Sequence, residues 1–313
     1  MEIKTIATDG SRAHFAPVLP EIPDNGKTLA RMHFDSLSEL AAMIPAKAPF
    51  GVDDSGHWTK QDEGFYGKTK SMADALKLAH DGWQEGADRA LPLLDRVNFA
   101  RPVKRALVRY DVAGAVPSVP RYLAGTPLHM KNKAPSQTNQ RPIITLVSST
   151  AAPWYVKPET FESAAVAALA IVDRLEDAGF RVEVIAGRRE SNDSAGTSDA
   201  TGQNNTRGDR SEVFFRLKAA QDPLDVARVV FGIGHPAVHR RLLFAVGEMH
   251  PAYKKSLGAY QGYAVAIAPL ERPVGTYILP AMAALNAAKI TDPIKAFDKA
   301  IETLKSQGCP GLE

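Results

Sequence analysis

The chain has 313 residues, of which 44% are hydrophobic and 23% are charged, and its formal net charge is +3. These values are typical of a soluble globular protein with one large or two ordinary domains. No apolar run approaches the ~18 residues of a membrane span, and Glu2 stands where a signal peptide would be basic. The single cysteine, Cys309, excludes an intrachain disulfide. We therefore expect a cytoplasmic protein without membrane contact.

The chain up to residue 134 is predicted to form a mainly helical section. Residues 1–30 are rich in Pro and Gly, and we expect an irregular arm or a short strand or two there. Helices are predicted over residues 35–44 and 71–80, because each stretch contains a serine followed three positions later by an acidic residue, as in a capping box. A third helix is predicted over residues 87–97.

Basic residues are concentrated between residues 101 and 141, where eight lysines and arginines stand against one acid, Asp111. They are Arg101, Lys104, Arg105, Arg109, Arg121, Lys131, Lys133 and Arg141. Such an excess suits a polyanionic partner, and we expect at most weak, sequence-independent binding of nucleic acid by the first four. The alternative is that they neutralise residues 51–100, which hold nine acids against six bases.

A domain boundary is predicted near residue 135. A strand is expected over residues 106–113, and residues 131–142 contain almost no apolar side chain, as is typical of a linker. We therefore divide the chain into the helical section over residues 1–134 and an α/β domain over residues 135–313.

The α/β domain opens with a strand–helix–strand pattern. Residues 143–147 form a continuous apolar run, typical of a strand buried on both faces. Pro158 and Glu159 open a helix whose apolar residues recur at three- and four-residue spacing until Gly179 ends it. Residues 181–185 form a second strand. A helical crossover of this length predicts that the two strands are parallel neighbours in one sheet.

A polar segment rich in Ser, Asn, Gly and Asp runs over residues 188–211. It has almost nothing to bury, so we expect a long disordered loop, and we expect limited proteolysis to cut the chain within residues 190–210. After it, strands are predicted over residues 212–218, 263–268 and 275–280, and helices over residues 225–231, 237–246 and 292–304. The alternation of strands and helices predicts a three-layer α/β sandwich with a mainly parallel sheet.

The residues at the carboxyl end of the first strand, Ser148, Ser149 and Thr150, are the main candidate site, because ligands of open α/β sheets bind beyond the carboxyl ends of strands. This strand, hydroxyl loop and helix resemble the von Willebrand factor A family, whose Asp-x-Ser-x-Ser motif holds a divalent metal. The resemblance implies a von Willebrand factor A-like fold; a Rossmann-like order is the alternative.

On that motif, Ser148 falls on the aspartate, Thr150 on the first serine and Ala152 on the second. A hard cation prefers carboxylate oxygens, and Ser148 supplies none, so we expect no metal at this site. The alternative to a ligand-binding role is a structural one, in which the three hydroxyl residues cap backbone groups in a tight turn.

Residues 67–86, which end in Gly-Trp-Gln-Glu-Gly, and residues 109–114 resemble a family of uncharacterised proteins from tailed phages and prophages. The similarity spans nearly the whole chain and carries no activity with it. It implies a phage-encoded protein in the host cytoplasm and leaves incorporation into a virion open.

Two further patterns have structural explanations. Residues 64–69 end like a phosphate-binding P-loop, but Asp62 stands where that motif needs a glycine. His235 and His239 have the spacing of metal ligands on one helix, yet no further ligand motif accompanies them. We therefore expect structural histidines.

Two functional hypotheses remain, and neither includes a cofactor. No nucleophile elbow or Cys–His pair is found in the sequence. The first hypothesis is a non-enzymatic binding or assembly protein that docks an unidentified protein partner at residues 148–150. The alternative is a nucleic-acid-binding or nucleic-acid-processing enzyme that holds phosphate with residues 101–141 and uses Asp111, Asp222 and Asp225 as acids. Aspartates at helix caps have a structural explanation, which favours the first hypothesis.

Overall fold

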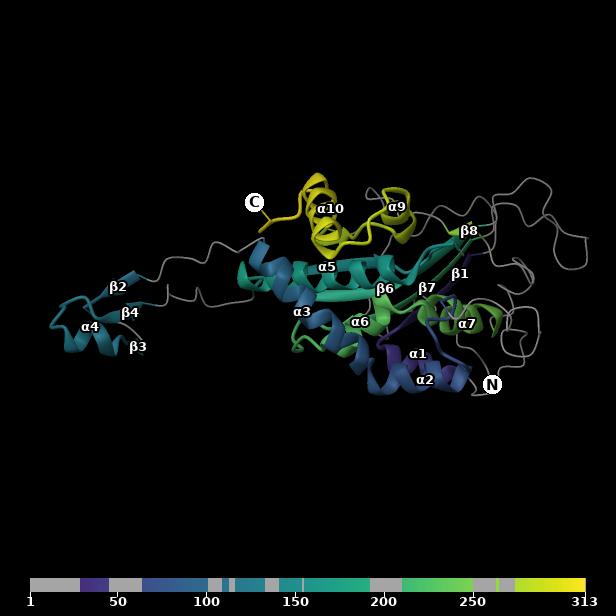
Figure 1. The fold of residues 1–313 in the computed structure, drawn as a ribbon, viewed down its shortest axis with the longest axis horizontal. Helices are drawn as coiled ribbons and strands as arrows, with labels where there is room; N and C mark the ends of the chain where they lie inside the picture. The colour runs from purple at the N-terminus through teal and green to yellow at the C-terminus, as the bar shows by residue number, and fades with distance from the viewer. Residues whose placement is uncertain are drawn as a thin grey trace, which may run out of the picture.

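The computed structural model describes residues 29–44, 64–100, 109–112, 116–132, 141–153, 155–191, 210–249, 263–264 and 274–312. The main sheet runs in the order β1-β7-β6-β5-β9, with β8 pairing with β6 off this path; β1, β6, β7 and β8 are labelled in Figure 1. The strands are β1 (Leu29–Phe34), β5 (Ile143–Ser149), β6 (Arg181–Ser191), β7 (Arg210–Lys218), β8 (Tyr263–Ala264) and β9 (Thr276–Ile278). β5 is parallel to β6 and β9, and β1 is parallel to β7, whereas β6 is antiparallel to β7 and β8. The predicted α/β class is confirmed, with a mixed and mostly parallel sheet.

The predicted strand–helix–strand unit is also confirmed. β5 and β6 pair in parallel from Ile143 beside Arg181 to Ser149 beside Gly187, and α5 (Pro158–Asp177) connects them. Proline suits the first helical position because the N–H it lacks would have no partner in the helix there. Gly179 follows the helix with a φ of +97°, a conformation that favours glycine.

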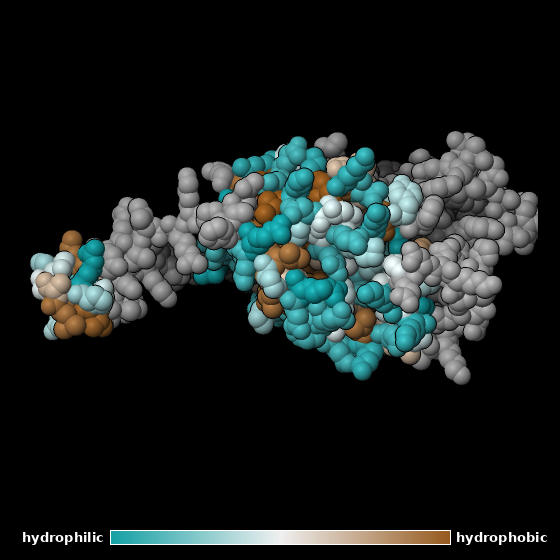
Figure 2. Space-filling model, viewed as in Figure 1, coloured by the Kyte–Doolittle hydropathy of each residue, from teal (hydrophilic) through white to brown (hydrophobic). Residues whose placement is uncertain are grey.

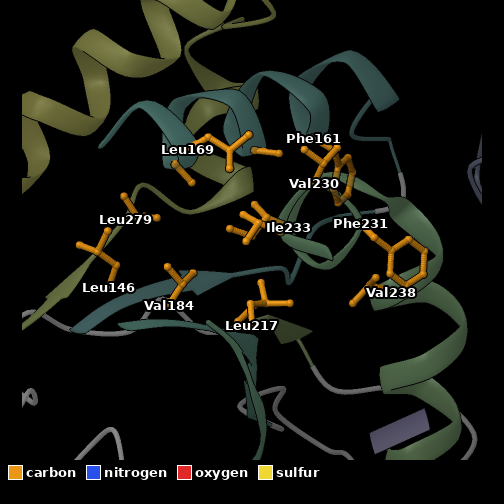
Figure 3. Packing of buried hydrophobic residues seen from close by; sticks show 14 of the residues in the cluster. Leu146, Phe161, Leu169, Val184, Leu217, Val230, Phe231, Ile233, Val238 and Leu279 are labelled. Atoms are coloured by element: carbon orange, nitrogen blue, oxygen red, sulfur yellow. The ribbon is translucent and has the colours of Figure 1, made fainter. Parts of the chain in front are cut away.

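Helices cover one face of this sheet, and some of them pack on other helices rather than on the strands. They are α1 (Leu37–Met43), α2 (Met72–Asp81), α3 (Gln84–Ala100), α5, α6 (Val226–Gly234), the π-helix η1 (Val238–Leu243), α7 (Phe244–Met249), α9 (Met282–Ala287) and α10 (Pro293–Ser306). Their buried side chains form one cluster with Leu146, Val184 and Leu217 from three neighbouring strands (Figure 3). Each fully buried side chain of this size contributes ~1.5–3 kcal/mol, so this cluster is the main stabilising core.

The opposite face of the sheet carries a small separate cluster, formed by Val147, Ile185, Phe214 and Ile278. Side chains alternate between the two faces along a strand, so Val147 points away from Leu146 and the helices. A three-layer sandwich needs helices over both faces. The described residues place helices over one face only, so the predicted third layer is not among the described elements.

The N-terminal section joins the same sheet and core. β1 pairs in parallel with β7, and Met32, Leu37 and Met72 lie in the same cluster as Leu146. Residues on both sides of the boundary expected near residue 135 therefore share one core.

The predicted helix starts follow the capping pattern. Ser71 Oγ accepts the N–H of Asp74 at 3.1 Å, and the Asp74 carboxylate accepts the N–H of Ser71 at 3.0 Å, which closes a capping box at α2. The third helix is longer than the predicted residues 87–97. It begins at Gln84, because Gly82, with a φ of +79°, ends α2 and only one residue separates it from the new helix.

The polar segment predicted as a loop over residues 188–211 is sheet at both ends. β6 runs on to Ser191 and β7 begins at Arg210, and the two strands pair as an antiparallel hairpin. The prediction was wrong there because the strand ends bury charged side chains in place of apolar ones. Residues 192–209, with most of the predicted protease-sensitive loop, lie outside the described residues.

A second sheet is built from β2 (Arg109–Asp111), β4 (Met130–Asn132) and β3 (Val116–Pro117), paired antiparallel in that order, with α4 (Val119–Leu123) following β3 (Figure 1). We call the described residues from 109 to 132 the small-sheet module. β2 forms part of the strand predicted over residues 106–113, whose first three residues lie outside the described residues.

The edge of β9 is covered by a side chain at the end of α10. Gln307 Oε1 accepts the N–H of Ile278 at 2.9 Å, and Gln307 Nε2 donates to the carbonyl of Ile278 at 2.7 Å. The Gln307 amide thus makes the two backbone hydrogen bonds that a further strand would make with Ile278. This contact lowers the tendency of the edge strand to pair with another chain.

Candidate functional site

The candidate residues Ser148, Ser149 and Thr150 are buried, with 3%, 3% and 1% of their surface exposed. Thr150 lies directly after β5, and its Oγ1 and its N–H both donate to the carbonyl of Gly187, at 3.0 and 2.7 Å. The Thr150 hydroxyl therefore binds a backbone group of the neighbouring strand, which is the structural role that we considered as the alternative.

Four arginines are buried near this strand end, and sequence reasoning missed them. They are Arg188, Arg189, Arg240 and Arg241, each at most 3% exposed. The first two continue β6 beyond the last residue paired with β5, and the other two lie on η1. Arginine is almost never fully buried unless it is paired, so the contacts of these four decide what the site can do.

Arg189 is paired with Glu212, the residue opposite it on β7. Its Nε donates to Glu212 Oε1 at 2.6 Å, and its Nη2 makes an ion pair with the same oxygen. Both side chains are almost fully buried. A lone charge would be strongly unfavourable in this interior, so each partner depends on the other.

Arg240 joins the strand-end loop to the segment before α2. Its Nη1 donates to the carbonyl of Phe65 at 2.8 Å, and its Nη2 donates to the carbonyls of Pro153 and Val156 at 3.0 and 3.3 Å. Burial lowers the pKa of Arg240 to about 10, so the side chain stays charged at neutral pH. The charged guanidinium therefore binds backbone carbonyls and holds these two segments together.

Arg241 holds the segment that resembles the end of a P-loop. Its Nε and Nη2 donate to Oγ1 and to the carbonyl of Thr69, both at 2.9 Å. Its guanidinium carbon lies 4.0 Å from the ring centre of Tyr66. Gly67, which lies between Tyr66 and Thr69 in the chain, has a φ of +61°. The segment is a turn fixed by η1, in agreement with the structural explanation.

His235 and His239 are buried where α6 meets η1. His235 Nδ1 accepts the N–H of Ala237 at 3.1 Å, and its ring packs edge-on against Trp83. Burial lowers the pKa of His235 to about 3. Burial and neighbouring arginines also hold the pKa of His239 well below its ordinary value. Both are neutral at pH 7, and within the described part of the chain no group of His, Cys, Asp and Glu residues could hold a metal ion.

We expect the neutral His235 to make folding sensitive to acid. In the unfolded chain its pKa is about 6.5, above the folded value of about 3, so stability is complete above pH 6.5 and is lost as the pH falls. The loss from this group at pH 5 is about 2 kcal/mol. Urea unfolding at pH 7.5 and 5.0 measures it. His235→Asn, which keeps an acceptor for Ala237, is expected to shrink the loss by that amount, whereas exposed His80→Asn leaves it unchanged. An undiminished loss in His235→Asn contradicts the assignment.

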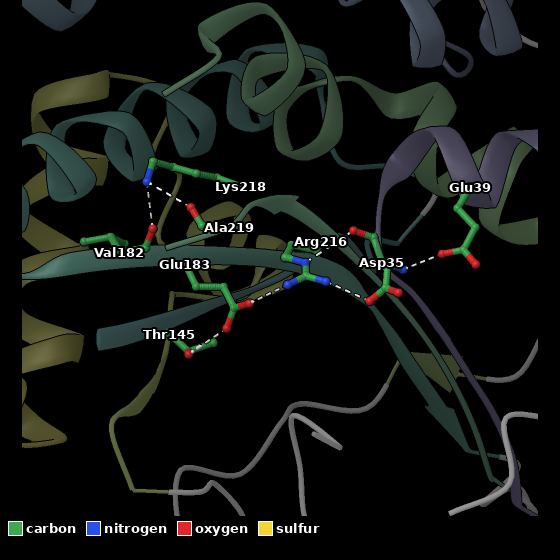
Figure 4. A network of polar contacts seen from close by, with 8 residues as sticks. All are labelled: Asp35, Glu39, Thr145, Val182, Glu183, Arg216, Lys218 and Ala219. Atoms are coloured by element: carbon green, nitrogen blue, oxygen red, sulfur yellow. Dashed lines mark hydrogen bonds and ion pairs between the residues drawn. The ribbon is translucent and has the colours of Figure 1, made fainter. Parts of the chain in front are cut away.

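A row of polar side chains crosses the second face of the sheet (Figure 4). Thr145 Oγ1 donates to Glu183 at 3.0 Å, and the Arg216 guanidinium lies 3.5 Å from Glu183 and 2.7 Å from Asp35. Burial raises the pKa of Glu183, and its contacts with Thr145 and Arg216 partly oppose this rise. The row ties β5, β6 and β7 to Asp35, the residue that follows β1.

Exposed apolar side chains are concentrated in the small-sheet module. Among the described residues nine large hydrophobic side chains are exposed, and five of them are in this module: Val112, Val119, Tyr122, Leu123 and Leu128. Leu123 is 77% exposed, and α4 has no buried residue. The module is the coloured part at the left of Figure 2, where brown side chains gather at the lower edge beside white and teal ones. Gathered apolar side chains of this kind mark interaction sites.

The predicted basic contacts are only partly described. Arg109 is the first residue of β2, whereas Arg101, Lys104 and Arg105 lie outside the described residues. Arg121, on α4, is exposed, and its Nη1 donates to the carbonyl of Leu128 at 3.3 Å. The module therefore carries positive charge beside its apolar side chains.

None of the helices in the described chain has the length and apolar character that a membrane crossing requires. No curated protein and no solved structure matches the sequence. A family model with the description Domain of unknown function (DUF7192) matches residues 16–309, which is nearly the whole chain. The protein therefore belongs to the DUF7192 family.

Proposed function

We propose that the protein is a non-enzymatic binding or assembly protein of a phage or phage-like element, and that it contacts its partner through the small-sheet module. The observation that carries this proposal is the exposed apolar surface of Val112, Val119, Tyr122, Leu123 and Leu128. Together these side chains expose on the order of 500 Å², the size of the largest apolar patch on a typical monomer, which is often functional.

The module replaces the strand end as the proposed docking site. The side chains of Ser148, Ser149 and Thr150 are buried, so a partner would have to open the loop to reach them. Of the three, Thr150 binds the carbonyl of Gly187, and its role in the proposal is indirect, because this bond stabilises the body that carries the module.

The proposal includes two more specific assignments, one of the fold family and one of the source. We favour a von Willebrand factor A-like body over a Rossmann-like one, because β5 ends in hydroxyl residues and leads through a short loop into α5. We propose a phage-type source on the similarity of residues 67–86, which form the turn before α2, α2 itself and the start of α3.

Site-specific photocrosslinking in the protein's native host tests the binding function. A photoreactive residue at position 123 is expected to form protein adducts above background, because Leu123 is the most exposed large hydrophobic side chain of the module. The control carries the same group at Glu302, an exposed residue of α10. Equal adduct yields from the two positions contradict the proposal, and nucleic-acid adducts would favour the alternative of nucleic-acid binding by residues 101–141.

A further inference from the structure

We infer that the small-sheet module docks on helix α3 of a second copy of this chain. The inference rests on the proposed function and adds the identity of the partner. It arises because the exposed face of α3 has the opposite charge and the same mixed apolar character as the module.

The module contributes an apolar surface with a positive charge. Within residues 109–132 the sequence holds Arg109, Arg121 and Lys131 against a single acid, Asp111. Two modules that met each other would bring like charges together, which disfavours a symmetric contact between them. A partner surface with an apolar centre and acidic flanks suits the module better.

Helix α3 presents such a surface. Asp88, Leu91, Pro92 and Asp95 are all exposed, and their spacing of three, four and seven residues puts them on one face of the helix. Leu91 is 44% exposed and is the large hydrophobic residue of α3 that faces out. The two carboxylates therefore flank an apolar residue, and their charge is opposite to the net charge of the module.

The arginines beside this face are engaged with other acids. Arg89 makes ion pairs with Glu85 and Glu162, and Arg96, seven residues further along the same side of α3, makes one with Asp292. Their charge is directed toward α5 and α10, so the stripe around Leu91 keeps its acidic character.

The two surfaces are different, so the contact is heterologous. Each copy that uses its module still offers its α3 to the next copy, and such contacts build rings or open filaments. Specific interfaces bury roughly 800 Å² on each partner. The apolar area of the module is somewhat smaller, so we expect reversible assembly that depends on protein concentration.

A charge exchange between two variants tests the inference. Wild-type protein is expected to associate as its concentration rises in sedimentation velocity. Arg121→Glu alone, or Asp88→Arg with Asp95→Arg, is expected to weaken association at least tenfold, because each places like charges across the contact. An equimolar mixture of the two variants restores opposite charges at every contact and is expected to regain association. Unchanged circular dichroism confirms that each variant folds.

Several outcomes overturn the inference. The inference is wrong if the wild-type protein stays monomeric at all concentrations. It is also wrong if the mixture of the two variants associates no better than each variant alone. The position-123 crosslink separates this inference from the proposed function. An adduct to residues 84–98 of another copy supports both, an adduct to a different protein overturns self-docking alone, and the lack of any protein adduct overturns both.

Discussion

Replacing Glu212 with glutamine is expected to destabilise the protein by about 3–5 kcal/mol, because it leaves the charge of Arg189 in a buried site without its carboxylate. Arg189 and Glu212 lie opposite each other in the central hairpin, and both are almost fully buried. Urea denaturation at neutral pH measures the change in the free energy of unfolding.

Two companion variants isolate the buried charge as the cause. Glu302→Gln removes one partner of the exposed Lys299–Glu302 pair, and we expect a change within about 0.5 kcal/mol. Replacing both buried partners with apolar residues, in Arg189→Met with Glu212→Leu, is expected to restore much of the stability that Glu212→Gln loses, since it removes both charges of the pair. A double variant no more stable than the single one contradicts this explanation.

The strand–helix–strand unit could be predicted because its signals are local. The apolar run of β5, the proline that opens α5 and Gly179 after its end all lie within 37 consecutive residues. The starts of α1 and α2 were equally visible, since a capping box needs only four neighbouring residues.

The buried arginines could not be predicted, because their partners are distant in the sequence. Arg189 meets a carboxylate 23 residues away, and Arg240 meets a carbonyl 175 residues away. A polar stretch with no visible partner is typical of a loop, so residues 188–191 were assigned to one. Burial of charge becomes favourable only once the tertiary fold supplies the opposite group.

The place of the hydroxyl residues at a strand end could be predicted from the sequence, but the contacts of their side chains could not. The apolar pattern of the strand places these residues at its carboxyl end, where Ser148 and Ser149 are the last residues of β5 and Thr150 follows. Whether hydroxyl groups there face a ligand or the protein's own backbone depends on the carbonyl of Gly187, which the sequence around residue 150 does not reveal. Likewise, the exposure of α4 could not be read from its apolar residues, because a helix of this composition usually buries one face.

Gly187→Ala is expected to destabilise the protein by about 3 kcal/mol, near the upper end of the usual cost of overpacking. A Cβ at this position would lie 2.7 Å from Cα of Phe214 and would clash with the carbonyl of Val213, both on β7. Backbone atoms in the middle of a sheet cannot move away as a side chain can, so β6 and β7 must separate locally. The same separation shifts the carbonyl of Gly187 that accepts both bonds from Thr150.

Gly64→Ala is the matched control, because its new Cβ meets Pro158 at an ordinary contact distance of 3.7 Å. We expect this variant to change the free energy of unfolding by no more than about 0.5 kcal/mol. Hydrogen exchange then locates the damage: in Gly187→Ala the amide of Thr150 should exchange faster than in wild type, whereas the amide of Ile278, held by Gln307 on the other side of β5, should keep its relative protection. Equal stability of the two alanine variants, or unchanged exchange at Thr150, would show that the close approach of β6 and β7 does not limit the residue at position 187.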